Sequence, residues 1–128
     1  MCSHEVRFRM RSKIWIEDEG GKVVFGLGRY RMLDLVRRTG SLNAAAKALK
    51  MSYRAVWMRI RKSEERLGRP LVMRDGNGSR LTPFGESLMD GFDRLHARVI
   101  AESDRFFEGL MADRLPEGPQ DPPSEESG

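Results

Sequence analysis

The sequence predicts a mainly α-helical fold with two small β-hairpins: a winged helix-turn-helix followed by a long C-terminal helix. Three observations lead to this prediction. Residues 41–67 read as two helices separated by a tight turn, residues 71–82 read as a hairpin, and an apolar repeat then continues for about seven helical turns. A hairpin placed directly after the second helix of such a pair is typical of a wing.

The N-terminal segment alternates apolar and basic residues, which predicts a strand over Val6–Glu17. The run Asp18–Gly21 is a turn signal, and Lys22–Phe25 returns as a second strand to complete a hairpin. A helix over Arg29–Thr39 follows, and Gly40 ends it.

The helix pair begins at Ser41, which directly follows Gly40 and is suited to cap a helix. Apolar residues then recur at i, i+3, i+4 and i+7, and the short alanine side chains would let another helix cross closely. Ser52 caps the next helix, whose apolar residues face a core while basic residues face outward. The inward residues are Leu42, Ala45, Ala46 and Leu49 on the first helix, and Val56, Ile60 and Leu67 on the second.

Gly68 and Pro70 end this pair, and the predicted wing has strands at Leu71–Arg74 and Ser79–Thr82. Pro83 suits the first position of the long helix that follows. Its apolar seam is longer than one small domain can cover, which predicts pairing with a second copy of the chain. The residues predicted to form this dimer contact are Leu88, Phe92, Leu95, Val99, Phe106 and Leu110.

The charge distribution favours an anionic partner. The 128 residues carry a net charge of +4, but residues 113–128 hold five acidic residues against one arginine, so residues 1–112 carry +8. Residues 50–80 contain nine Lys or Arg against three acidic residues. This density predicts binding to double-stranded DNA. The acidic tail, which holds four of the six prolines, is expected to be disordered.

Catalytic and metal chemistry find no support in the sequence. The chain has one cysteine and two histidines, and it contains no metalloprotease, P-loop, paired-cysteine or nucleophile-elbow motif. His96 is expected to be a surface or seam residue. We therefore expect no enzymatic activity and no cofactor. The absence of a long apolar run and of a signal-peptide pattern predicts no membrane association and a cytoplasmic location.

Specific roles can be assigned along the second helix of the pair. Tyr53 and Arg54, on its first turn, are best placed to reach base edges, and Arg61 lies beyond them. Trp57 has two possible roles: it completes the core against the first helix, or it lies against the sugar–phosphate backbone. The residues predicted to contact DNA are Ser41, Asn43, Ser52, Tyr53, Arg54, Trp57, Arg59, Arg61, Lys62, Arg74, Asn77 and Arg80.

The run GSLNAAAKALKMSYRAVW and the later LTPFG resemble the N-terminal DNA-binding domain of the molybdate-responsive ModE regulators, and more distantly the LysR-type winged helix-turn-helix. The resemblance covers about residues 11–95. It implies a dimer, joined largely through the first and last helices, that reads a two-fold-related operator. It also implies that Ser52, Tyr53 and Arg54 begin the recognition helix, with Ser41 and Asn43 in the preceding cap region.

Two features depart from the ModE pattern. The predicted wing turn, residues 75–79, is short where family members often carry a long glycine-rich wing. The family's C-terminal molybdate-binding domains have no counterpart in this sequence, so molybdate binding is not expected of this chain.

The function predicted is therefore that of a homodimeric, sequence-specific transcription regulator, possibly of molybdenum-related genes. Two alternatives remain open: an architectural protein that binds DNA with little sequence preference, and a protein-interaction adaptor. The predicted organisation is an N-terminal hairpin at 1–26, the winged helix-turn-helix at 27–82, the dimerisation helix at 83–112 and the tail at 113–128.

Overall fold

The computed structural model describes residues 7–114, with side chains through residue 112, and divides into two compact units. One unit is Lys13–Leu95, and the described parts of the other are residues 7–12 and 96–114. Helix α4 (Pro83–Arg114) contributes residues to both. The first two residues of the predicted tail are thus helical, and the remainder of that tail lies outside the described residues.

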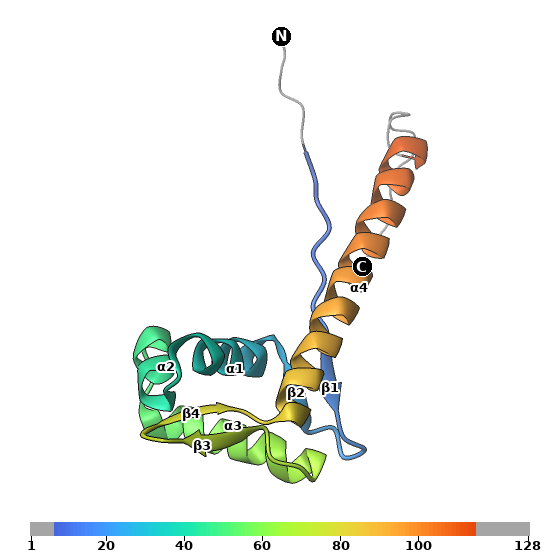
Figure 1. Cartoon of the computed structure of the whole chain (residues 1–128). Helices are drawn as coiled ribbons and strands as arrows, with labels where there is room; N and C mark the ends of the chain where they lie inside the picture. The colour runs from blue at the N-terminus through green and yellow to red at the C-terminus, as the bar shows by residue number, and fades with distance from the viewer. Residues whose placement is uncertain (1–6, 115–128) are drawn as a thin grey trace. The chain divides into compact units, whose positions relative to one another are not determined.

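The unit Lys13–Leu95 contains both hairpins, the helices α1, α2 and α3, and the first part of α4 (Figure 1). Helix α1 (Leu27–Thr39) contacts α2 (Leu42–Leu49), α3 (Tyr53–Leu67) and the wing. The wing pairs β3 (Val72–Asp75) with β4 (Gly78–Leu81) in antiparallel register. The predicted fold class, a winged helix-turn-helix with two small hairpins and a long C-terminal helix, is confirmed.

One hydrophobic core holds these elements together. Its central side chains come from every helix: Leu33 and Val36 of α1, Ala45 of α2 and Val56 of α3 are each 0% exposed. Burial of such apolar side chains is the main stabilising contribution to a domain of this size. Phe92 of α4, predicted at the dimer seam, is only 4% exposed and packs edge-on against Phe25 at 5.1 Å. That prediction is wrong for Phe92, because its own chain already covers it.

The N-terminal hairpin is shorter than predicted. Strand β1 covers only Trp15–Glu17, and it pairs with β2 (Val23–Gly26). Residues 7–14 are not a strand, although their alternation predicted one. The reason is the partner: β2 has four residues and leads directly into α1, so no further backbone is available to pair with the preceding segment.

Glycine and one lysine supply the left-handed positions that end the helices. Gly40 (φ 73°) ends α1 and Gly68 (φ 77°) ends α3, as predicted. The end of α2 is different: Lys50 occupies the left-handed region with φ 59° and ψ 41°, and its amide donates to the carbonyl oxygens of Ala46 and Lys47. A residue with a Cβ atom is strained in this conformation.

The junction between the wing and α4 depends on Thr82. Its hydroxyl donates to the carbonyl oxygen of Pro70 at 2.8 Å and accepts from the amide of Gly85 at 2.9 Å, so it caps α4. Its backbone amide donates to the carbonyl oxygen of Leu71 at 2.9 Å. Gly85 is required here, because a Cβ atom at this position would lie 2.5 Å from the Leu71 oxygen.

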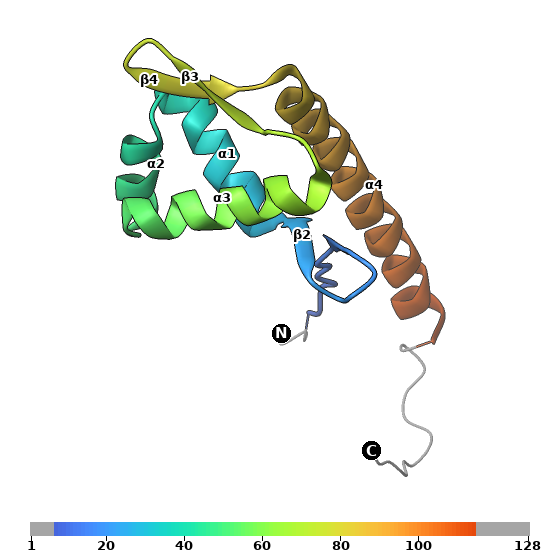
Figure 2. The ribbon, with the colours of Figure 1, turned by 90° about the horizontal axis from the view of Figure 1, so that it is seen from below.

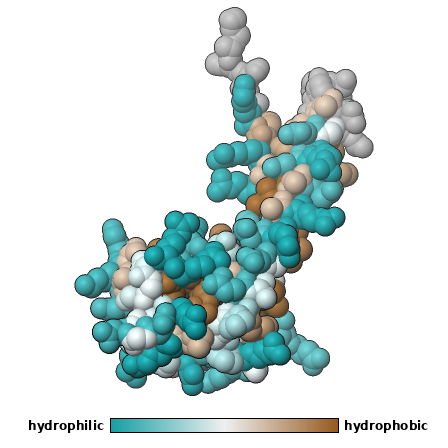
Figure 3. All heavy atoms as spheres, viewed as in Figure 1, coloured by the Kyte–Doolittle hydropathy of each residue, from teal (hydrophilic) through white to brown (hydrophobic). Residues whose placement is uncertain are grey.

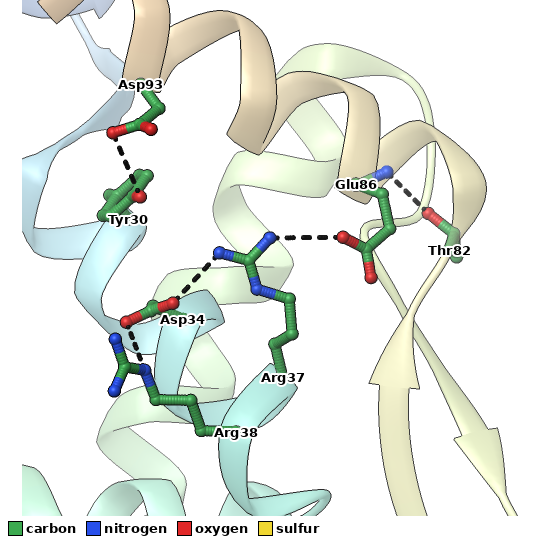
Figure 4. Close-up of polar contacts among 8 residues, drawn as sticks. Tyr30, Asp34, Arg37, Arg38, Thr82, Glu86 and Asp93 are labelled. Carbon is green, nitrogen blue, oxygen red and sulfur yellow. Dashed lines mark hydrogen bonds and ion pairs between the residues drawn. The ribbon is translucent and has the colours of Figure 1, made fainter. Parts of the chain in front are cut away.

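Polar contacts connect α1 with the first part of α4 (Figure 4). Arg37 forms an ion pair with Asp34 at 3.0 Å and a second with Glu86 at 3.3 Å. The hydrogen bond to Asp34 is the main reason why the pKa of Arg37 is raised. The hydroxyl of Tyr30 contacts Asp93 at 3.4 Å, and burial together with this carboxylate raises the pKa of Tyr30.

In the second unit, residues 8–11 and residues 104–112 of α4 line a groove of about 680 Å³. Phe107 and Met111 supply its apolar lining, and Asp104 and Glu108 face it together with Arg9 and Arg11. A neighbouring stripe of the same helix stays exposed. Its residues include Leu95, Phe106 and Leu110. None of the helices in the described part of the chain is long and apolar enough to cross a membrane.

Candidate nucleic-acid interface

The candidate interface begins with the outward face of α3. Val56 and Ile60 are buried, so the opposite side of the helix is exposed and presents Tyr53, Arg54 and Trp57 to solvent. Tyr53 and Trp57 are one helical turn apart and therefore lie in the same row, which Arg61 continues. In Figure 2 the wing and α3 lie at opposite edges of the helix-turn-helix, and α1 is visible between them.

Two serines cap the N-terminal ends of α2 and α3. Ser41 accepts a hydrogen bond from the Ala44 amide at 3.1 Å, and Ser52 accepts one from the Ala55 amide at 3.0 Å. Both are therefore N-caps, as predicted. A hydroxyl that accepts from a backbone amide still has its own O–H to donate.

A concavity of about 540 Å³ lies between the start of α2, the start of α3 and the wing. It brings together six of the residues predicted to contact DNA, from three separate parts of the sequence. Leu42, which is buried, and Val72, which is half-buried, also line it. The six predicted residues on its walls are Ser41, Asn43, Tyr53, Trp57, Arg74 and Asn77.

Trp57 lies on the wall of this concavity and is 37% exposed, so it does not complete the core. The guanidinium of Arg61 lies 5.2 Å from the centre of the Trp57 ring, at the range of a cation–π contact. Arg61 also forms an ion pair with Glu64 at 3.4 Å. Two partners therefore restrain Arg61.

Glu64 was not predicted as part of the site, yet it holds the wing against α3. One carboxylate oxygen accepts hydrogen bonds from the backbone amides of Leu71 at 2.7 Å and Val72 at 3.2 Å. Hydrogen bonds from amides to a carboxylate are stronger than neutral ones. Because it receives these bonds at the start of β3, Glu64 sets where the wing begins.

The two wing arginines do not share a face. In the register of the wing, Arg74 lies opposite Ser79, and Arg80 lies opposite Met73. Neighbouring residues in a strand alternate between faces, so Arg74 and Arg80 lie on different sides of the hairpin. Arg74 lines the concavity and Arg80 does not.

Arg59 lies on another side of α3 from the concavity. Burial lowers the pKa of Arg29, and the nearby charges of Arg66 and Arg59 lower it further. Arg29 donates to the Ser63 hydroxyl at 3.1 Å, and Ser63 donates to the carbonyl oxygen of Val24 at 2.6 Å. This group of residues fastens β2 to α3.

Sequence reasoning did not include Met58 and Met73 in the site. Met58 is 45% exposed on α3, and Met73 is 38% exposed on the wing and lines the concavity. A methionine at helical or strand spacing is more often a core residue, so the sequence did not indicate that these two side chains lie on the surface. The wing register and the burial of Val56 are what place these two side chains outside.

Comparison with known proteins addresses the same segment. Residues 27–86 match the family model of the bacterial regulatory helix-turn-helix protein, lysR family. This segment, just under half of the chain, is similar to a LysR-type helix-turn-helix domain. The match begins at the first residue of α1 and ends in the first turn of α4, so the LysR-type domain includes the helix pair and the wing.

The resemblance to ModE proteins is also confirmed. The chain is 33% identical over 87 residues to the "Molybdenum transport protein ModE" of Azotobacter vinelandii, which covers 64% of this chain and 32% of that protein. It is 35% identical over 72 residues to the "Transcriptional regulator ModE" of Haemophilus influenzae, which covers 52% of this chain and 28% of that protein. The chain therefore spans about a third of the length of these relatives.

Solved structures agree on the fold of the LysR-type domain. The DNA-binding domain of CbnR, in complex with DNA, superposes with a TM-score of 0.54 at 24% identity, covering 65% of this chain and 95% of that one. Full-length LysG from Corynebacterium glutamicum gives a TM-score of 0.50 at 29% identity, covering 66% of this chain and 29% of that one.

Proposed function

We propose that this chain binds double-stranded DNA in a sequence-specific manner, as a homodimeric transcription regulator. The observation that carries the proposal is the outward face of α3, where Arg54 and Lys62 are exposed beside the concavity that α2 and the wing complete. A helix of this kind, capped at its start and held by a second helix, is what enters the major groove in helix-turn-helix proteins. The CbnR DNA-binding domain and full-length CbnR, both solved in complex with DNA, support the same proposal.

Separate residues would supply affinity and sequence choice. Arg54 can form the two parallel hydrogen bonds that a guanine edge accepts, and Tyr53 and Arg61 lie in reach of neighbouring bases. The hydroxyls of Ser41 and Ser52 would donate to phosphate oxygens from the helix starts. The other predicted phosphate contacts are Arg59, Lys62, Arg74 and Arg80. Asn43 and Asn77 are further predicted DNA contacts, and Trp57 would lie against the backbone or a base.

The dimer would use the exposed stripe of α4. Leu95 is 50% exposed and Phe106 is 76% exposed, and Figure 3 shows apolar atoms on the surface of this helix. Val99 and Leu110 lie along the same stripe, whereas Leu88 packs partly and Phe92 fully within its own chain. Contiguous apolar surface of this kind is typical of a protein contact.

Because of the names of the ModE relatives, the operators of molybdenum-related genes are the first that should be tested for binding. The proposal does not include catalytic activity. It does include a cytoplasmic location, where such a regulator would meet DNA.

The test is to select duplexes from a randomised pool with the purified chain, and then to measure the affinity of the selected duplex against salt concentration. We expect a dyad-symmetric sequence that binds about a thousandfold or more tightly than random DNA. An affinity that depends steeply on salt without an enriched sequence would support the architectural alternative. No binding at physiological salt would contradict DNA binding and support the adaptor.

A further inference from the structure

The basic surface around α3 contains an unusual number of exposed apolar side chains. Tyr53 is 48% exposed, Trp57 37%, Met58 45% and Met73 38%. A phosphate backbone gives such side chains little to contact, because it offers charged oxygens. In the major groove, the one apolar group that a base pair presents is the 5-methyl group of thymine.

Trp57 is the best placed of the four. It lies one turn inside α3 and lines the same concavity as Leu42 and Val72. The contact with Arg61 restrains its ring, so the tryptophan presents a fixed surface to a ligand. A restrained side chain loses less conformational entropy when it binds than a mobile one.

We propose that Trp57 reads thymine through its 5-methyl group, while Arg54, one turn closer to the start of α3, reads guanine. Each half-site would then hold a thymine that packs its methyl group against the Trp57 ring. This inference rests on the proposed function and adds a base identity to it.

A competing use of an exposed tryptophan is stacking on an unpaired base, as in proteins that bind single strands. In a duplex the base faces are covered by their neighbours, so a side chain in the groove meets only base edges. The two uses therefore differ in what they require of the nucleic acid. Methyl reading needs a duplex and a methyl group, whereas stacking needs neither.

The experiment uses the full chain and the duplex selected from the random pool. Each thymine is replaced in turn by deoxyuridine, which differs from it only by lacking the 5-methyl group, and the dissociation constant is measured. We expect about a fourfold weakening, the value of one buried methyl group, at one or two positions in each half-site and no change elsewhere. In the Trp57→Ala variant the same positions should become insensitive.

Arg54→Ala is the matched control, since it changes the same helix face but should keep the deoxyuridine effect. Trp57→Gln serves as a second variant if Trp57→Ala fails to fold, and the scan with the unmodified chain does not depend on either. Sensitivity to deoxyuridine that persists without Trp57 would overturn the assignment. So would a wild-type chain that binds its selected duplex equally well with every thymine replaced, although DNA recognition would then still stand.

Two further outcomes are distinguishable. If no duplex is enriched, the proposed function itself fails, and this inference fails with it. If single-stranded DNA of the same sequence competes as well as the duplex, Trp57 stacks on bases and methyl reading is wrong.

Discussion

The backbone amide of Ser79 donates a 2.9 Å hydrogen bond to the carbonyl oxygen of Gly40, and this bond joins the wing to the turn between α1 and α2. Ser79 lies opposite Arg74 in the hairpin, and Gly40 precedes Ser41, the cap of α2. The bond therefore places a wing arginine and the start of α2 on the walls of one concavity. It explains how residues from 41 to 79 form a single surface.

We expect Gly78→Ala to destabilise the domain and weaken DNA binding. A Cβ atom at this position would lie 2.3 Å from the carbonyl oxygen of Gly40, so the wing must move away from the α1–α2 turn. The free energy of unfolding should fall by about 1–3 kcal/mol in urea titrations. Gly91→Ala is the matched control: it lies in α4 with open space around it, and should raise stability by about 0.5–1 kcal/mol. Equal behaviour of the two variants would contradict this account of the wing.

Glu64→Gln should loosen the wing, and it also removes the ion pair between Glu64 and Arg61. The substitution replaces charge-assisted hydrogen bonds to the amides of Leu71 and Val72 with weaker neutral ones. A loss of about 1 kcal/mol in unfolding free energy is expected by urea denaturation. The neighbouring exposed Glu65→Gln should be neutral within about 0.5 kcal/mol. The idea fails if Glu65→Gln costs as much.

Arg54→Ala and Lys62→Ala should affect DNA binding differently. Removing Arg54 should cost about 1–3 kcal/mol on the selected duplex and relax the preference at one base pair. Removing Lys62 should weaken all sequences about equally and lower the slope of affinity against salt by about one charge. Binding assays on the selected duplex and on random DNA, at several salt concentrations, separate the two. A uniform loss for both variants would show that the roles are wrongly assigned.

The exposed apolar stripe of α4 predicts how the proposed dimer responds to substitution. Phe106→Ser should shift the chain toward monomer at micromolar concentration and leave its helical content unchanged, since this side chain is 76% exposed. Phe92→Ser should instead unfold the domain, because it removes a core side chain that packs on Phe25. Sedimentation and circular dichroism of both variants measure the difference. A dimer that survives Phe106→Ser together with Leu95→Ser would refute this seam.

Lys50→Gly should stabilise the chain. Lys50 ends α2 with φ 59°, a backbone conformation that costs a residue with a side chain about 1–2 kcal/mol and that glycine adopts without this cost. The greater freedom of glycine in the unfolded chain offsets about 0.5–1 kcal/mol of this gain. A net gain of up to about 1.5 kcal/mol is expected in urea denaturation, with Lys50→Asn in between. A decrease in stability would mean that the lysine side chain contributes contacts that outweigh its strain.

The helices of this fold were predictable from local patterns because their caps and apolar spacing agree with their packing. Ser41, Ser52 and Gly68 sit where the sequence placed the ends of α2 and α3. The first strand was over-extended, since alternation says nothing about whether a partner strand exists. Phe92 could not be separated from the exposed stripe by spacing, because only the position of Phe25 decides which face of α4 is covered.

The candidate site was predictable in its helical part and less so in its wing. Exposure of Arg54 follows from burial of Val56 and Ile60, which helical spacing gives directly. The separation of Arg74 from Arg80 depends on the hairpin register, and a shift of one residue would reverse it. The role of Glu64 could not be predicted from the sequence, because it depends on where the fold places the backbone amides of Leu71 and Val72.

The bonds from Thr82 to Pro70 and Leu71 close the wing at its base, where the chain enters and leaves the hairpin. The ends of this loop therefore stay together whatever lies between Asp75 and Gly78. Loop-closure entropy grows only with the logarithm of length, so that doubling a loop costs about 0.6 kcal/mol. Insertions at the tip should consequently be tolerated, and wings of very different reach can evolve on this domain without reshaping its core.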